Sequence, residues 1–361
     1  MRVVYFGTYE RQYSRNRQVV SALRAAGVEV TEIHEDVWEA VEHKYAAGAR
    51  FALRAALAQI RLLLRKREPF DVMIVGYPGH PDMPVARLVA RRRPIVFNPL
   101  VSLKDTFVDD RRRFAAGSVG GRLLELVDRF AIRLSTVTVA DTNTHADFLA
   151  ELARVPRTRI SVCFVGADED VSHPPWHPER PFTAVFAGKF SPLHGLDTIV
   201  AAARLLPETP FRIIGRGQLE PVLSAAPGNV EWIPWLDLAS LGNEYRRAGA
   251  VLGIFGTTPK AKRVIPNKVF QAIACGAPVV TGDTPGAREL LRDGRDALLV
   301  PSGDPPALAT AIERLQHDED LARAIGQRGH ATYRHCASEA VLGEEWRRVL
   351  EGAVLRPRPG P

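Results

Sequence analysis

The feature that most restricts the fold of this sequence is an alternation of short apolar runs with helical patterns, which occurs twice. The first series of runs typical of strands covers 2–7, 28–34, 71–77, 94–102, 136–142 and 160–168. Prolines and polar residues fill 169–181, and a second series follows at 183–189, 211–215, 230–235, 250–256, 278–283 and 297–301. Strands that are apolar throughout are covered on both faces, as in parallel α/β sheets.

The pattern therefore predicts two doubly wound, Rossmann-like α/β domains. We expect the first domain at 1–180 and the second at 181–335, because the proline-rich stretch reads as a linker. Helical patterns are visible at 15–26, 49–66, 196–206, 238–248, 268–275, 288–291, 306–316 and 318–352. A length of 361 residues agrees with two domains of ordinary size.

Composition excludes several classes of protein. The three cysteines, Cys163, Cys275 and Cys336, are odd in number and lack metal-like spacing, which favours a reducing, cytoplasmic compartment without disulfides or zinc. The N-terminal run "MRVVYFG" is typical of a first strand and too short for a signal peptide. No apolar run approaches the ~18 residues that a membrane span requires.

The chain is basic, with a formal net charge of +7, which permits an acidic partner such as phosphate or an anionic membrane surface. Nucleic acid is not expected, because the "RRR" runs at 91–93 and 111–113 lack interleaved aromatic residues. Residues 49–70 predict a basic amphipathic helix that could lie on an anionic membrane. We expect instead that its Leu, Ile and Phe side packs on its own sheet.

The stretch "IPNKVFQAIACGAPVV" (265–280) predicts a helix with an unusual polar face. Lys268 and Gln271 lie three residues apart on one side, at the positive end of the helix dipole. The preceding loop adds Lys260, Lys262 and Arg263. These residue types favour a site for an anion with hydroxyl groups beside it, such as a nucleotide diphosphate. The alternative is a solvated basic loop followed by a core helix.

Two glycine-containing turns strengthen this interpretation. In "FAGKFSPLHGLDTIV", Gly188 and Lys189 follow a strand and His194 precedes a helix, so that the lysine and the histidine could reach one phosphate. In "IIGRGQ", Gly215 precedes Arg216, and glycine permits a close approach of a ligand to the backbone. Taken alone, each turn could equally be an ordinary connection between a strand and a helix.

Together these motifs resemble the retaining family-four glycosyltransferases. The resemblance rests on "GKFSPLHGLDTI", "IIGRGQ", "VLGIFG", "VIPNKVFQAIACGAPVV", "ARELLRDGRDALLVPSGD" and "ALATAIERL", in that order. It implies two Rossmann-like domains that face each other across a cleft, the GT-B fold. It also implies transfer of a sugar from a nucleotide diphosphate to an acceptor with retention of configuration, without a metal or another cofactor. The N-terminal domain would hold the acceptor, the C-terminal domain the donor, and a helix within 336–361 would cross back to the first domain.

The resemblance also implies roles for particular residues. Lys189 matches a basic residue that holds the donor diphosphate. Gly256 and Thr257 match a loop of backbone donors, and Gly7 matches the turn of the first domain that closes on the donor. Glu289 matches an acidic residue whose role is loop support.

Three positions depart from the family pattern. His194 stands where lysine is usual; a protonated histidine would supply the charge, so we expect activity to weaken above neutral pH. Arg263 stands where a glutamate usually contacts the donor sugar, and Gln271 stands where a second glutamate usually bonds the ribose. An amide can still accept a bond from a hydroxyl, and the phosphate role shifts to Lys268.

In such enzymes the leaving diphosphate takes the acceptor proton, so that catalysis is mainly charge stabilisation by fixed groups. We expect Lys189 and Lys268 to provide it, with His194 in support. His80, Asp105 and His145 are candidates on the acceptor side, although each could be structural.

The acceptor could be a small molecule, a glycan or a lipid-linked molecule, with the enzyme cytoplasmic or at the inner face of the membrane. The main alternative is a degenerate transferase that binds nucleotide sugar or a partner enzyme without turnover. An epimerase or a sugar-nucleotide hydrolase on the same fold is disfavoured, because acidic residues are absent from 256–271.

Overall fold

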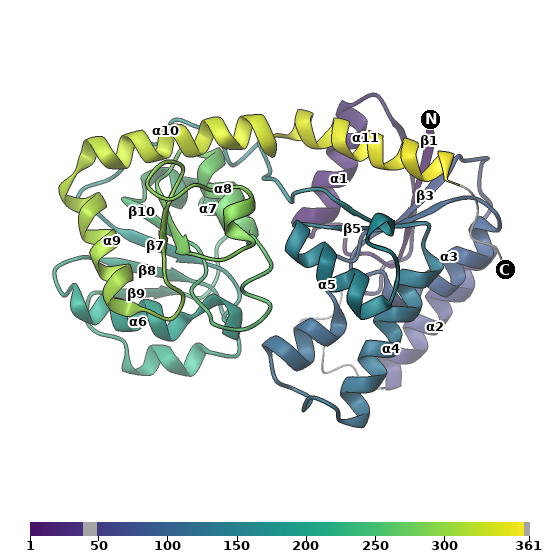
Figure 1. The fold of residues 1–361 in the computed structure, drawn as a ribbon, viewed down its shortest axis with the longest axis horizontal. Coiled ribbons are helices and arrows are strands. Elements are labelled where there is room, and N and C mark those ends of the chain that lie inside the picture. The colour runs from purple at the N-terminus through teal and green to yellow at the C-terminus, as the bar shows by residue number, and fades with distance from the viewer. Residues whose placement is uncertain (39–48, 357–361) are drawn as a thin grey trace. The chain divides into compact units, whose positions relative to one another are not determined.

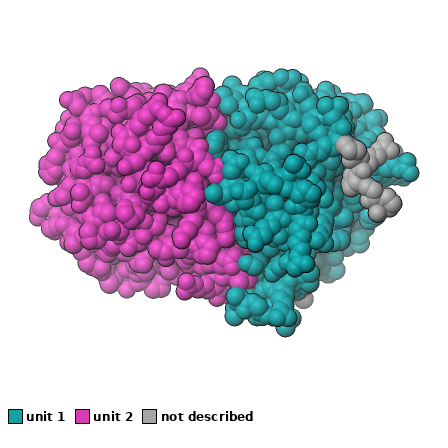
Figure 2. Space-filling model, in the orientation of Figure 1, with its two compact units in different colours: residues 1–104, 114–164, 339–361 teal, residues 105–113, 165–338 magenta. Residues whose placement is uncertain are grey.

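The computed structural model describes residues 1–38 and 49–356, which belong to two compact units (Figures 1 and 2). Unit 1 contains residues 1–104, 114–164 and the chain from 339 onward, and unit 2 contains 105–113 and 165–338. The division therefore falls at 165 and 339, whereas the sequence pattern places it at 181 and 336. No sequence pattern indicates that 105–113 leaves the unit of its neighbours.

Unit 1 is built on a parallel six-stranded sheet with the order β2-β1-β3-β4-β5-β6. The strands are β1 (Arg2–Gly7), β2 (Glu29–His34), β3 (Val72–Val75), β4 (Ile95–Phe97), β5 (Val137–Ala140) and β6 (Ile160–Val162). The helices are α1 (Ser14–Ala25), α2 (Ala49–Leu64), α3 (Met83–Ala90), α4 (Val119–Leu134), α5 (Asn143–Ala153) and α11 (Glu339–Leu355). One core lies between the sheet and α1 with α11, and the other between the sheet and α2 to α5 (Figure 1).

Unit 2 repeats the design with a parallel six-stranded sheet in the order β12-β11-β10-β7-β8-β9. Its strands are β7 (Ala184–Ala187), β8 (Phe211–Ile214), β9 (Val230–Ile233), β10 (Ala250–Leu252), β11 (Val279–Gly282) and β12 (Leu298–Val300). Its helices are α6 (Leu196–Leu205), α7 (Leu238–Arg247), α8 (Asn267–Ala274), α9 (Pro305–His317) and α10 (Glu319–Cys336). Helices α6 and α9 pack together and contribute to the core of this unit.

The predicted fold class, α/β with two doubly wound parallel sheets, is confirmed. All predicted strands are present, although most are shorter than their apolar runs. The predicted helix at 288–291 is a 3-10 turn at Ala287–Glu289, and the helical tail is divided into α10 and α11 at Ala337 and Ser338. No helix among residues 1–38 and 49–356 is long and apolar enough to cross a membrane.

In sheets of this type, ligands bind beyond the carboxyl ends of the strands, where the strand order reverses. In unit 2 this point lies between β7 and β10, because the chain continues from β7 to β8 on one side and reaches β10 on the other. The turns after these two strands contain Gly188 and Gly256. In unit 1 the corresponding point lies between β1, which ends at Gly7, and β3, which His80 follows.

Candidate functional site

Three predicted residues of unit 2 meet at the reversal point between β7 and β10. Gly188 has a φ of +155°, and a Cβ placed on it would lie 2.8 Å from Nζ of Lys268 and 3.4 Å from Nε2 of His194. A side chain at position 188 would therefore occupy the space that these two nitrogens face. Lys268 and His194 come from different connections of the sheet, so the fold, and not sequence proximity, joins them.

Lys268 is an unusual buried cation. Its side chain belongs to the first turn of α8 and is only 5% exposed. Nζ has no hydrogen-bond partner among the described atoms, and it lies 3.6 Å from the centroid of the Phe186 ring. Burial lowers the pKa of Lys268 well below its ordinary value. A buried ammonium without a hydrogen-bond partner lowers the stability of the protein. An anion bound beside it would restore much of that stability.

His194 is held as a hydrogen-bond donor and not as a cation. The backbone N–H of Ser191 donates to Nδ1 at 3.4 Å, and Ser191 Oγ lies 3.1 Å from the same atom. Because a backbone N–H can only donate, the proton of the neutral ring belongs on Nε2, the atom beside Gly188. Burial, and after it the charge of Lys268, lowers the pKa of His194 well below its ordinary value.

This result corrects the expectation that His194 supplies positive charge and weakens activity above neutral pH. The ring is surrounded by cations: besides Lys268, the charges of Lys260, Arg111 and Lys189 also depress its pKa. The four basic side chains come from separate segments of unit 2, and together they make the electrostatic potential at the ring positive. Lys189 itself is exposed.

The loop before α8 is tied to the segment 105–113. Arg263 donates to the buried carboxylate of Asp105 at 2.6 Å, and Lys260 Nζ donates to Thr106 Oγ1 at 2.7 Å. The segment begins as a π-helix, Asp105–Asp110. Asp105, expected on the acceptor side, therefore lies in unit 2 as the partner of Arg263.

The glycine turns have a different role from the predicted one. A Cβ on Gly215 would lie 2.0 Å from the carbonyl oxygen of Gly188, and a Cβ on Gly256 would lie 2.3 Å from that of Pro192. At both glycines, the close neighbour is another segment of the protein backbone and not the space for a ligand. The N–H of Gly256 already donates to Leu193 at 3.1 Å, so it is not a phosphate donor in this conformation.

The remaining predicted residues of unit 2 lie in two environments. Gln271 and Lys268 are both buried, so the predicted polar face of α8 is not a solvent-exposed one. Thr257 and Arg216 are exposed. The Arg216 guanidinium lies 5.7 Å from the Trp232 ring centroid and forms an ion pair with Glu220 at 3.7 Å.

In unit 1, Gly7 and His80 belong to tightly bonded networks. A Cβ on Gly7 would lie 2.4 Å from Asp82 Oδ2, and Asp82 also accepts from the Thr8 N–H at 2.8 Å. Burial raises the pKa of Asp82. No signal in the sequence identifies Asp82 as the residue that holds this turn.

His80 has both ring nitrogens beside acceptors. Nδ1 lies 2.6 Å from the carbonyl oxygen of Pro78, and Nε2 lies 3.0 Å from Asp128. Both nitrogens are engaged by acceptors of the protein, so the geometry is that of a structural residue. In the third acceptor-side candidate, His145, Nδ1 lies 2.5 Å from Asp141, and the buried Nε2 has no hydrogen-bond partner among the described atoms.

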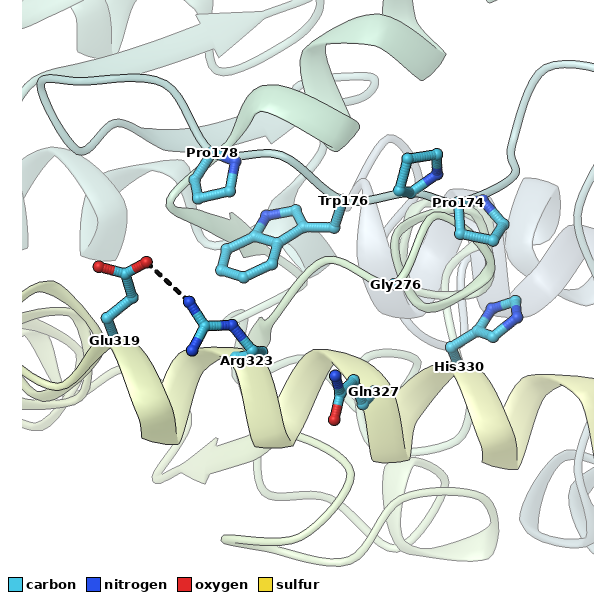
Figure 3. Close-up of a pocket in the computed structure, with 9 residues that line it drawn as sticks. Pro174, Trp176, Pro178, Gly276, Glu319, Arg323, Gln327 and His330 are labelled. Carbon is cyan, nitrogen blue, oxygen red and sulfur yellow. Dashed lines mark hydrogen bonds and ion pairs between the residues drawn. The ribbon is translucent and has the colours of Figure 1, made fainter.

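A hollow of about 390 Å³ lies elsewhere in unit 2, at the C-terminal end of α8 (Figure 3). Trp176 and the prolines of the linker form one side, and Arg323, Gln327 and His330 rise from α10 on the other. Gly276, which follows α8, also lines it. The residues that converge on Gly188 do not line it.

Comparison with known proteins agrees with this geometry. Residues 181–318 match the family described as "Glycosyl transferases group 1". The chain is 30% identical over 169 residues to "Exopolysaccharide phosphotransferase SCO2592" of Streptomyces coelicolor, covering 44% of this chain and 17% of that protein. It is 30% identical over 243 residues to "D-inositol 3-phosphate glycosyltransferase" of Nocardia farcinica, covering 60% of this chain and 51% of that protein. The chain thus spans about half or less of these relatives.

Solved structures match the whole fold. A sucrose-phosphate synthase from Thermosynechococcus elongatus superimposes with a TM-score of 0.74 at 15% identity, covering 97% of this chain and 99% of that one. Anabaena Alr3699/HepE in complex with UDP and glucose superimposes with a TM-score of 0.70 at 14% identity, covering 98% and 100%. At such identities the likeness concerns the fold alone, which is the GT-B fold of glycosyltransferases.

Proposed function

We propose that this chain, whose residues 181–318 form a group 1 glycosyltransferase domain, transfers a sugar from a nucleotide diphosphate to an acceptor with retention of configuration. The proposal rests on one observation: Lys268 Nζ and His194 Nε2 both face the space beside Gly188. We assign donor binding to unit 2 and acceptor binding to unit 1. The UDP in the Alr3699/HepE structure makes a uridine nucleotide the first donor to test.

In this proposal the donor diphosphate lies against the Lys268 ammonium, with its oxygens near Gly188. The bond between the anomeric carbon and the diphosphate oxygen breaks, and negative charge grows on the departing group. The Lys268 ammonium and the exposed Lys189 stabilise that charge, and the His194 Nε2–H donates a hydrogen bond to it. The acceptor hydroxyl forms the new bond on the same face and gives its proton to the departing oxygen.

Arg263 and Asp105 have a supporting role in this mechanism. The ion pair with Asp105 offsets the charge of Arg263, so the proposal assigns the charge that acts on the diphosphate to Lys268 and Lys189. In this proposal Gln271, which is buried three residues after Lys268 in α8, accepts a hydrogen bond from a ribose hydroxyl.

A panel of nucleotide sugars tests the proposal directly. Incubation of the full chain with each donor should release nucleotide diphosphate from one of them, and NMR of the glycoside should show the anomeric configuration of the donor. Release should fall at least ~100-fold in Lys268→Ala, because one fixed charge on the leaving group is lost. Release that does not depend on Lys268 would reject the site.

The second candidate is a degenerate transferase that binds nucleotide sugar without turnover. The neutralised Arg263 and the amide of Gln271 favour it, because neither is an acidic group that could hold the donor sugar. Donor binding without release of diphosphate, with any acceptor of the panel, would identify this candidate.

A further inference from the structure

Helix α2 exposes an apolar stripe that the sequence analysis expects to be buried. Leu53, Leu57, Ile60 and Leu64 recur at intervals of three and four residues and therefore share one side of the helix. All four are exposed, Leu64 by 75%, whereas Leu62 packs into the core. The expectation that the leucine side of this helix packs on its own sheet is wrong for most of these residues.

A second stripe of the same kind lies on α4. Val119, Leu123, Leu126 and Phe130 follow the same spacing, and all are exposed, Val119 by 87%. The intervening helix α3 packs against both α2 and α4 and exposes Leu88. We call the two stripes and Leu88, on three helices that pack in sequence, the apolar patch. Exposed apolar side chains that gather on neighbouring helices point to an interaction site.

Basic residues surround the apolar patch. Residues 51–67 contain no Asp or Glu and carry Arg54, Arg61, Arg65, Lys66 and Arg67. Glu35 lies 3.7 Å from Arg61 and 3.3 Å from Arg65, and Asp36 lies 3.9 Å from Arg54, so these arginines are partly neutralised.

The other two helices are basic as well. Arg91, Arg92 and Arg93 follow α3, and Arg122 and Arg133 are exposed on α4. The acidic groups of α4 are engaged, because Glu125 forms an ion pair with Arg129 and the buried Asp128 contacts His80. The rim of the patch therefore has an excess of positive charge.

We propose that the apolar patch docks on an anionic phospholipid bilayer. Leucine and phenylalanine side chains enter the acyl boundary while the arginines and Lys66 remain among the headgroups. A second copy of the chain fits this surface less well, because a symmetric contact would bring two basic rims together. The proposal goes beyond the transfer reaction and does not require turnover.

Co-sedimentation of the full chain with vesicles tests this proposal. Vesicles of phosphatidylcholine with about one third phosphatidylglycerol should bind the chain about tenfold more tightly than pure phosphatidylcholine, and added salt should weaken binding. The double variants Leu57→Gln/Ile60→Gln and Leu123→Gln/Leu126→Gln should each lower partitioning onto the vesicles about tenfold.

The matched control is Leu205→Gln on α6 of unit 2. Leu205 is an apolar side chain outside the patch, and its exposed fraction of 53% is close to the 54% of Ile60. This control should bind as the wild type does.

Donor turnover separates this proposal from the proposed function. The patch variants should release diphosphate from the donor at the wild-type rate with a water-soluble acceptor. Failure of the chain to bind either vesicle would overturn the membrane proposal and leave the transferase proposal intact. Binding that survives both double variants would also overturn it. A dimer in sedimentation velocity that the leucine variants abolish would assign the patch to a second copy instead.

Discussion

At the scale of single residues, burial of Lys268 should lower the stability of the protein while it serves the binding of an anion. Nothing in the described structure hydrogen-bonds Nζ, and the side chain is buried. A buried polar group without a partner costs about 1–3 kcal/mol. Lys268→Met should therefore raise the free energy of unfolding of the nucleotide-free protein by about 1–2 kcal/mol. Urea unfolding measures this change, and a less stable variant would show that Lys268 has a structural partner.

The protonation of His194 should appear in the pH dependence of stability. Its pKa is lowered in the folded protein, so the unfolded chain takes up this proton first as the pH falls. Stability should therefore decrease below pH ~6.5, by up to ~1.4 kcal/mol per pH unit. Gln can place an N–H near the position of Nε2 but does not titrate, so His194→Gln should lose this dependence. Equal slopes for the two proteins between pH 7 and pH 5 would contradict the neutral ring.

The sequence indicates Lys268, His194 and Gly188 because each falls directly after a strand or at a helix start. It does not indicate that His194 is neutral, because the charges that depress its pKa come from loops far apart in the sequence. The partnership of Asp105 with Arg263 spans 158 positions, and no local pattern encodes it. For the same reason the network of His80 with Asp128 cannot be read from the motif around His80.

At the scale of elements, the segment 105–113 is the unexpected part of unit 2. It fixes the loop before α8 through Asp105 and Thr106. Removing one partner of a buried ion pair costs about 3–5 kcal/mol in typical cases. Because Arg263 is partly exposed, Asp105→Asn should destabilise the protein by about 2–3 kcal/mol.

A double-mutant cycle isolates this ion pair. Asp105→Asn combined with Arg263→Gln should cost less than the sum of the two single changes, because the second change no longer leaves an unpaired charge. Urea unfolding of the four proteins measures the coupling. Additive effects would mean that the ion pair contributes nothing beyond the separate side chains.

The elements themselves were largely predictable. Apolar runs mark the central strands, whose residues are buried, whereas the edge strands β2 and β9 contain charged residues and are mostly exposed or half-buried. The ends of the strands were overestimated because the residues that follow a strand, such as those after β4 and β10, remain apolar while packing in loops. The amphipathic pattern of α2 identified a helix but not its buried side, because leucines occur on more than one of its faces.

At the scale of the whole molecule, the last helix completes unit 1. Trp346 of α11 is buried, and the Arg15 guanidinium of α1 lies 5.3 Å from its ring centroid. Trp346→Ala should therefore lower the unfolding transition of unit 1, with a cost of about 3–5 kcal/mol. The transition of unit 2, identified by its shift with nucleotide, should not move. Calorimetry resolves the two transitions, and an equal shift of both would show that they unfold together.

The central claim is that the cations of separate loops in unit 2 act on one diphosphate, with Lys268 foremost. Isothermal titration of UDP into Lys268→Met tests it most directly, with Lys262→Met as the control, since Lys262 is an exposed lysine in the loop before α8. We predict that UDP affinity falls at least ~30-fold in Lys268→Met, because ~2 kcal/mol of a charge-assisted contact is lost. The control should stay within about twofold of the wild type. Equal losses in the two variants, or an unchanged affinity in Lys268→Met, would contradict the account.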